Sequence, residues 1–333
     1  MSKVIEIQEI ALADWDELVA ASPVATWFQT KEAYDFFDCL SFLEAFALGI
    51  ESGGRLKGVV VGFVQKDGGK INQHLSRRAI VNGGPLLADD FTDEELSQLL
   101  NALKARLHRK AIYIETRNFN DDSRWRQTFE DVGFAYEPHY DIWVDTSSME
   151  VVDANLGKSR KRDIRVSMRD GASLVTNPTI EQVRSYYLIL NDLYQNKVKT
   201  PLFPLEFFEQ LFRLPSSAFL LVEYDGQIVG GTVCLGLSGK VLYEMFACGR
   251  DGVHKSIFPS ELATFAGLQY AVEHDMSRFD MMGAGRPEDG GYGVRDFKLK
   301  FGGELKELGR NRCVCNRLLY GIGKMGVKIM KRR

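Results

Sequence analysis

The sequence predicts an α/β protein that contains two copies of one structural unit. In segments 51–61 and 223–233 a Glu, two glycines and a final Val coincide at an offset of 172 positions, and each segment is typical of two strands joined by a glycine turn. Helical apolar spacing then recurs in segments 95–103 and 261–269. A short apolar strand follows each of these helices, at 111–115 and 277–281.

The remaining elements repeat in the same order. A short helix and a long strand are expected at 125–131 and 134–144 in the first copy and at 292–300 and 304–315 in the second. The second copy opens with three expected helices, at 158–169, 179–195 and 205–213. This organisation predicts a first domain at 1–148, a second domain at 149–315 and a basic C-terminal tail at 316–333.

Composition restricts the class of protein. The chain of 333 residues is 45% hydrophobic and 26% charged, as expected for a soluble globular protein with room for two domains. It has no run of about eighteen apolar residues, and acidic residues interrupt the N-terminal segment where a signal peptide needs an apolar core. The five cysteines are scattered, which fits reduced thiols and a cytoplasmic location and predicts no metal site.

Positive charge is concentrated in two segments. Residues 155–170 carry six Lys or Arg against two Asp, and residues 304–333 carry nine Lys or Arg against two Glu, although the whole chain has a net charge of −3. Such basic patches suit anionic partners such as phosphates, RNA or a lipid surface, and they equally suit a solvated helix face.

The segment from Gly291 to Gly303 contains the candidate catalytic residue. Phe297 and Phe301 are four positions apart and therefore share one face of a helix, with Lys298 at the edge of that face. A cation fixed beside an apolar pocket can stabilise negative charge that develops during a reaction. The alternative is an amphipathic helix with solvated lysines.

The order of hairpin, strand, glycine-containing loop, helix and strand resembles the GNAT acetyltransferase fold. Two such units in tandem, ending in Phe-Lys-x-x-Phe-Gly-Gly at 297–303, resemble the Fem family of peptidyltransferases. The resemblance also includes the segments Thr26–Lys31, Lys158–Gly171, Tyr243–Gly249 and Phe279–Met282. It implies two domains, each with a mixed, mostly antiparallel sheet flanked by helices.

By this resemblance the protein would be an acyltransferase that moves an aminoacyl group from aminoacyl-tRNA to an amine of a peptidoglycan precursor. The expected partners are aminoacyl-tRNA and an anionic precursor that is linked to a nucleotide or a lipid, and no cofactor is expected. The coiled-coil arm of some tRNA-binding members is absent, because no heptad run occurs in the sequence.

The resemblance also assigns candidate site residues. Lys298 would stabilise the transition state, with Phe297 as its apolar neighbour in the core or against the substrate. A tyrosine in the strand around Tyr243 would contact the substrate, or would be buried and hydrogen-bonded. The other candidates would bind phosphates of the acceptor or the RNA, and for some of them a surface position is the alternative: Lys197, Lys199, Lys31, Arg160 and Arg162.

Two other functions remain open at this level. One is an acyl-CoA-dependent N-acyltransferase that acts on an amino sugar or another small amine, although neither copy has the usual glycine-rich pyrophosphate loop. The other is a non-catalytic binding protein that keeps the fold. The stretch 318–333 mixes apolar and basic residues, and a peripheral contact with the inner membrane surface is expected there, although its glycines weaken a helix.

Overall fold

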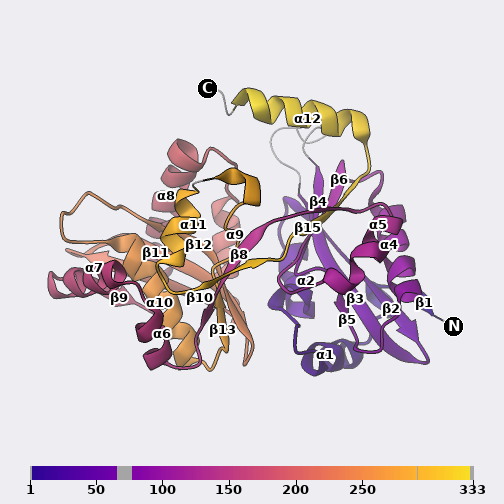
Figure 1. Cartoon of the computed structure of the whole chain (residues 1–333), viewed down its shortest axis with the longest axis horizontal. Helices are drawn as coiled ribbons and strands as arrows, with labels where there is room; N and C mark the ends of the chain where they lie inside the picture. Colours follow the sequence, from indigo (N-terminus) through magenta and orange to yellow (C-terminus); the bar gives the residue numbers. More distant parts are fainter. Residues whose placement is uncertain (1, 66–76, 291, 331–333) are drawn as a thin grey trace. The chain divides into compact units, whose positions relative to one another are not determined.

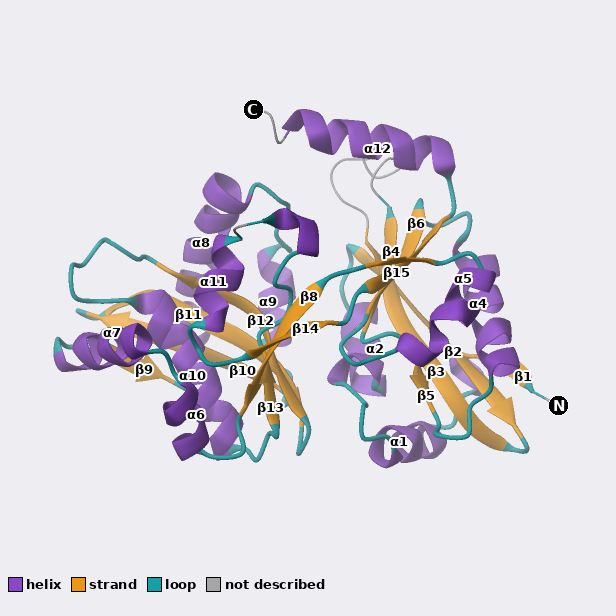
Figure 2. Ribbon diagram, in the orientation of Figure 1, coloured by secondary structure: helices purple, strands orange, loops and turns teal. Residues whose placement is uncertain are grey.

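A computed structural model describes residues 2–65, 77–290 and 292–330. The chain forms two compact units, unit 1 from residues 1–138 and 308–333, and unit 2 from residues 139–307. Each unit has one sheet with helices against it (Figures 1 and 2).

Unit 1 is built on an eight-stranded sheet. Its main path runs β1-β2-β3-β4-β6-β15-β7, and β5 pairs with β3. β4 and β6 are parallel, and the other pairs are antiparallel. The elements are β1 (Lys3–Glu6), η1 (Ile7–Glu9), α1 (Leu12–Ala21), η2 (Trp27–Gln29), α2 (Lys31–Asp38), β2 (Leu43–Ser52), β3 (Arg55–Gln65), β4 (Arg78–Asn82), β5 (Leu86–Leu87), α4 (Asp93–Leu107), β6 (Tyr113–Arg117), η3 (Ser123–Trp125), α5 (Arg126–Asp131), β7 (Ala135–Glu137), β15 (Arg310–Val314) and α12 (Arg317–Met330).

Unit 2 repeats this plan on a seven-stranded sheet of order β14-β8-β13-β12-β11-β10-β9. Its parallel pair is β12 and β13. The elements are β8 (Tyr140–Asp145), α6 (Met149–Asn155), α7 (Lys158–Arg169), β9 (Ser173–Val175), α8 (Ile180–Leu193), η4 (Tyr194–Val198), α9 (Leu205–Leu211), β10 (Ser217–Tyr224), β11 (Gln227–Leu237), β12 (Val241–Gly249), α10 (Pro259–Glu273), β13 (Arg278–Asp280), η5 (Pro287–Asp289), α11 (Gly293–Leu299) and β14 (Glu304–Glu307).

The duplication predicted from the sequence is present in the structure. The two predicted hairpins are β2–β3 and β10–β11, and the long helices α4 and α10 each span 15 residues. Each long helix packs its apolar side chains on one face of its sheet. The third residue of each helix is a glutamate that pairs with a cation from its own unit, Glu95 with Lys57 and Glu261 with Arg160.

The last strands of the two halves are exchanged, which differs from the expectation of one continuous strand at the end of each copy. The segment 134–144 breaks between β7 and β8, and β8 joins the sheet of unit 2 between β13 and β14. The segment 304–315 breaks between β14 and β15, and β15 joins unit 1 between β6 and β7. The colours of Figure 1 show this exchange, with magenta β8 among orange strands and yellow-orange β15 among purple ones.

The exchange explains why the units do not follow the expected boundaries at 148 and 315. Short breaks at Pro138-His139 and Leu308-Gly309 send the chain from one sheet to the other. Gly309 has a φ of +72°, and a side chain there would meet the ring of Tyr136. The predicted tail at 316–333 contains helix α12, and its residues 331–333 lie outside the described part of the chain.

Candidate active site

The candidate site of unit 2 lies where its two parallel strands separate. β12 and β13 are paired only from Val241–Tyr243 to Arg278–Asp280, after which β13 ends and β12 continues to Gly249. A register shift between Val233 and Cys234 of the partner strand β11 leaves Met245 of β12 without an opposite residue. Because the pairing of β13 with β12 ends at Asp280, the backbone carbonyls that follow β13 can bind a group other than the β12 strand.

Lys298 of α11 binds these carbonyls. Its Nζ donates hydrogen bonds to the backbone oxygens of Met281 (2.5 Å), Met282 (3.1 Å) and Gly283 (3.1 Å). Met282 has a φ of +55°, which is strained for a non-glycine residue. The backbone N–H of Met282 donates to Oδ1 of Asp280 (2.8 Å), and this turn directs the three carbonyls towards the ammonium group.

Three buried carboxyl groups surround this ammonium group: Asp141, Glu244 and Asp280. Burial lowers the pKa of Lys298, and the charges of Glu244, Asp141 and Asp280 act against this effect. Burial raises the pKa of Glu244, whose Oε1 accepts a hydrogen bond from Thr264 (2.9 Å). Burial and the neighbouring carboxyl groups thus act in opposite directions on the charge of Lys298, and the three backbone carbonyls accept the hydrogen bonds of its Nζ.

Asp280 is the most unusual of the three. Its side chain has 0% exposure, and burial raises its pKa to about 6 against the lowering charges of Arg278 and Lys298. Within the described residues, its Oδ2 has no hydrogen-bond donor at normal geometry. The nearby indole of Trp143 favours the charged form of Asp280. Burial nevertheless favours the neutral form of Asp280, beside the candidate catalytic lysine.

Two of the predicted site residues belong to the core around Lys298. Phe297 is partly buried against the core of unit 2 and lies 5.3 Å from the Phe301 ring. Arg160 is buried, its guanidinium lies over the Phe297 ring at 4.4 Å, and its Nη1 donates to Glu261 at 2.6 Å. The internal carboxylate of Glu261 holds the charge of Arg160 in this structure, and phosphate binding by Arg160 stays a prediction.

Tyr243 also has a structural position. Its side chain has 0% exposure, and burial raises its pKa well above the usual value. Tyr243 is therefore buried, as one of the two alternatives expects, and its contact with a substrate stays a prediction. Its partner in the parallel strand is Asp280.

The remaining predicted residues are accessible to solvent. Lys197 lies in the π-helical turn η4, and Lys199 ends this turn with a φ of +55°. Arg162 is exposed on α7 and pairs with Asp163 at 2.8 Å. Lys31 belongs to unit 1, in the first turn of α2, and pairs with Asp35 one turn later. Phosphate binding by these four side chains stays a prediction.

Helix α7 presents a cationic face at a pocket of about 450 Å³. The face arises because Asp163 and Ile164 are buried, whereas the basic residues of the helix other than Arg160 are exposed or partly exposed. One acidic side chain, Asp153, is exposed there and pairs with Lys161 at 3.0 Å. The pocket is lined by Asp153, Leu156, Lys158, Lys161, Arg162, Ile164, Arg165 and Phe265.

The N-termini of the two long helices carry negative charge. In α10, the backbone N–H of Ser260 donates to Oδ1 of Asp251 (3.1 Å), and its hydroxyl donates to Oδ2 (2.5 Å). In α4, Thr92 caps the helix and three acidic residues occupy the first turn. Carboxylates at both helix starts disfavour a pyrophosphate there.

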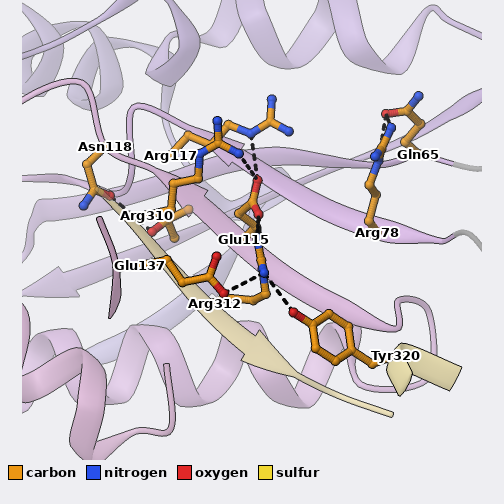
Figure 3. Close-up of polar contacts among 10 residues, drawn as sticks. Gln65, Arg78, Glu115, Arg117, Asn118, Glu137, Arg310, Arg312 and Tyr320 are labelled. Atoms are coloured by element: carbon orange, nitrogen blue, oxygen red, sulfur yellow. Dashed lines mark hydrogen bonds and ion pairs between the residues drawn. The ribbon is translucent and has the colours of Figure 1, made fainter. Parts of the chain in front are cut away.

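The position in unit 1 that corresponds to Asp280 is occupied by Glu115. Each is the third residue of the parallel strand after the long helix, and each lies opposite an exchanged strand, Glu115 opposite Arg312 and Asp280 opposite Trp143. Figure 3 shows Glu115 between the guanidinium groups of Arg117, Arg310 and Arg312. The distances are 2.9 Å to Arg117, 3.2 Å to Arg310 and 2.5 Å to Arg312.

Lys298 was predicted from the sequence, whereas the three carboxyl groups beside it were not. Glu244 and Asp280 lie inside the segments Tyr243–Gly249 and Phe279–Met282, where each interrupts an apolar strand. A charged residue within a buried strand was the available signal. Asp141 carried no comparable signal, because it lies near the start of its strand, next to the polar residues Glu137 and His139.

The described residues were also compared with the requirements of a metal site and of a membrane-spanning helix. Within residues 2–65, 77–290 and 292–330, no three His, Cys, Asp or Glu side chains are grouped so that they could hold a metal ion. In the same residues, no helix combines the length and the apolar character that crossing a membrane requires.

The chain has the tandem GNAT fold, which it shares with two solved structures. The chain is similar in structure to FemX, with a TM-score of 0.73 and 14% identity over 96% of this chain and 99% of that one. A tandem GNAT protein from the clavulanic acid biosynthesis pathway has a TM-score of 0.59 and 12% identity, over 95% of this chain and 99% of that one.

A third structure is the C-terminal domain of a putative lysylphosphatidylglycerol synthetase from Agrobacterium fabrum. Its TM-score is 0.55 and its identity is 13%, over 82% of this chain and 86% of that one. At these identities the likeness is one of fold. No family model matches the sequence, and no curated protein matches it.

Proposed function

We propose that this protein is an aminoacyltransferase that moves an aminoacyl group from aminoacyl-tRNA to an amine of an anionic peptidoglycan precursor. The observation that carries the proposal is the ammonium group of Lys298, fixed by three carbonyls where β12 and β13 separate. The shared fold with FemX and with a putative lysylphosphatidylglycerol synthetase supports the same class of reaction.

The proposed step needs a cation at this place. The acceptor amine attacks the ester carbonyl, a C–N bond forms, and negative charge develops on the carbonyl oxygen. The ester C–O bond then breaks, and the leaving ribose oxygen takes up the proton that the amine loses. Lys298 would stabilise the oxyanion before the bond breaks.

All three N–H groups of Lys298 already have acceptors, so the oxyanion must replace one of them. The bond to Gly283 is one of the two longer ones, and Gly283 is the exposed residue among the three that accept. We therefore expect the oxyanion to approach from the side of Gly283.

The cationic face of α7 supports an RNA donor. Lys158, Lys161, Arg162 and Arg165 line one pocket, and cations spaced along a helix can follow the charges of a phosphate backbone. We also propose that three lysines bind the phosphates of the acceptor: Lys197, Lys199 and Lys31. A lysine binds phosphate as a point charge, so their contribution would be less directional than that of arginine.

Acyl-CoA is the weaker donor candidate. Asp251 occupies the N-terminus of α10 and three acidic residues begin α4, so a diphosphate at either place would meet like charge. A non-catalytic binding protein is the remaining alternative, and it predicts ligand binding without transfer.

The test is a transfer assay with the full-length protein. Labelled aminoacyl-tRNA is offered with a nucleotide-linked or a lipid-linked muropeptide, and in parallel acetyl-CoA is offered with the same acceptors. Label moving from tRNA to a muropeptide supports the proposal. Transfer only from acetyl-CoA would establish the alternative donor, and binding of both substrates without transfer would establish the non-catalytic protein.

A further inference from the structure

Helix α12 carries an apolar stripe that nothing in the described part of unit 1 covers. Leu318 is 74% exposed and Ile322 is 44% exposed. The two positions are four residues apart and therefore about 40° apart around the helix. The same period places positions 325 and 329, a Met and an Ile in the sequence, in line with them.

The opposite side of the helix attaches it to unit 1. Tyr320 lies about 200° around the helix from Leu318. Its hydroxyl accepts a hydrogen bond from Nη1 of Arg312 (2.8 Å; Figure 3). Its ring packs edge-on against Tyr113 at 5.6 Å. Arg312 is in turn held by Glu115 and Glu137. The helix is thus fixed through its Tyr320 side and leaves Leu318 and Ile322 exposed.

Charge indicates what covers the stripe. Residues 317–333 contain six Lys or Arg and no Asp or Glu. Positions 317, 324 and 328 fall within about 40° of one another and about 100° from the centre of the stripe. An apolar stripe with a basic flank is the pattern of a helix that lies in the interface of an anionic membrane. An RNA surface would match the charges but would leave Leu318 and Ile322 without an apolar partner.

We infer that α12 is a peripheral membrane anchor that binds anionic lipid, with Leu318 and Ile322 inserted between acyl chains and the basic flank at the headgroups. This inference goes beyond the proposed transfer reaction and does not depend on it. The anchor would hold unit 1 at a membrane whether the acceptor is lipid-linked or not.

The test is flotation of the full-length protein with vesicles. We expect binding to equal mixtures of phosphatidylglycerol and phosphatidylcholine, weakening as salt is raised, and little binding to phosphatidylcholine alone. The double variant Leu318→Glu/Ile322→Glu should weaken binding at least about thirtyfold, since two apolar side chains no longer insert. The double variant Lys324→Gln/Lys328→Gln should weaken it about thirtyfold and flatten the salt dependence.

A matched control uses the same chemistry elsewhere. Leu188 of α8 is 64% exposed, so Leu188→Glu should leave vesicle binding unchanged. Thermal unfolding of each variant shows whether it is folded. Equal binding by wild type and the Leu318→Glu/Ile322→Glu variant, or equal binding to neutral and anionic vesicles, would overturn the inference. Sedimentation velocity without lipid is the second measurement, and a dimer that this double variant dissociates would show that the stripe covers another copy of the chain instead.

Discussion

Glu115 of unit 1 and Asp280 of unit 2 occupy the same position in two copies of one fold, yet their surroundings are opposite. Three arginines surround Glu115, and although burial raises its pKa, their charges lower it to about 2. Asp280 has fewer cations around it, and burial raises its pKa to about 6. The charge of Glu115 is therefore fixed at neutral pH, whereas Asp280 is close to its titration point.

The difference shows how a duplicated fold separates stability from function. In unit 1 the arginine cluster joins β6 to the exchanged strand β15. In unit 2 the same place holds a turn that presents carbonyls to Lys298. A group with a perturbed pKa beside a buried cation is typical of a reactive site, whereas a fully compensated carboxylate is typical of a structural ion pair.

The largest expected effect is on stability, from Glu115→Gln. The variant leaves three guanidinium groups without their shared counter-charge, and breaking a buried pair in this way costs about 3–5 kcal/mol. Asp280→Asn should not lower the free energy of unfolding at neutral pH, since it removes a carboxyl group whose charged form is disfavoured by burial. Urea unfolding at neutral pH measures both, and equal costs would remove the contrast.

The second expected effect is on catalysis, from Lys298→Ala. Transfer should fall by about 10²–10³, the usual loss when an oxyanion donor is removed. Phe129 and Glu130 in unit 1 correspond to Phe297 and Lys298, and Glu130 is exposed, so Glu130→Ala is the matched control with unchanged activity. Single-turnover rates with labelled aminoacyl-tRNA measure the effect, and full activity of Lys298→Ala would remove the proposed role.

The third effect is an opposite dependence of stability on pH. The pKa of Glu115 is about 2 in the folded chain against an ordinary 4.5, so its stabilisation is complete above 4.5 and is lost as the pH falls towards 2. The pKa of Asp280 is about 6 against an ordinary 3.8, so its contribution is complete below 3.8 and is lost as the pH rises through 6.

Each contribution is at most about 3 kcal/mol over its whole titration. The measurement compares unfolding curves of wild type, Glu115→Gln and Asp280→Asn across acid pH. Lowering the pH should reduce the advantage of wild type over Glu115→Gln and should increase it over Asp280→Asn. If both differences in unfolding free energy changed in the same direction with pH, the opposite pKa shifts of Glu115 and Asp280 would be refuted.

The smallest effect concerns the position of Lys298. Asp280→Asn keeps an oxygen that can accept from the N–H of Met282, whereas Asp280→Ala loses it. We expect about a tenfold loss of transfer from the Ala variant and a smaller loss from the Asn variant, because a misplaced catalytic group lowers the rate. Equal losses from the two variants would show that charge and not the turn positions Lys298.

Much of this fold could be predicted from sequence, because the hairpins and long helices follow strong local periodicities. The strand exchange could not, since 134–144 and 304–315 each keep the pattern of one strand. Pro138 and Gly309 are the visible signals, but they do not tell which sheet receives the next residues. The burial of Arg160 and Tyr243 was also hidden, because burial depends on contacts with residues far away in the sequence.

The exchanged strand β15 also determines when unit 1 can be completed during synthesis. In the described sheet β6 and β7 are joined only through β15, and 314 − 137 = 177 residues separate the end of β7 from the end of β15. At about 5–20 residues per second, the ribosome needs roughly 10–35 s to make this interval. Until then β6 presents an unpaired edge, which is where a nascent chain is most prone to aggregate. The earliest-made unit of this protein therefore folds to completion last.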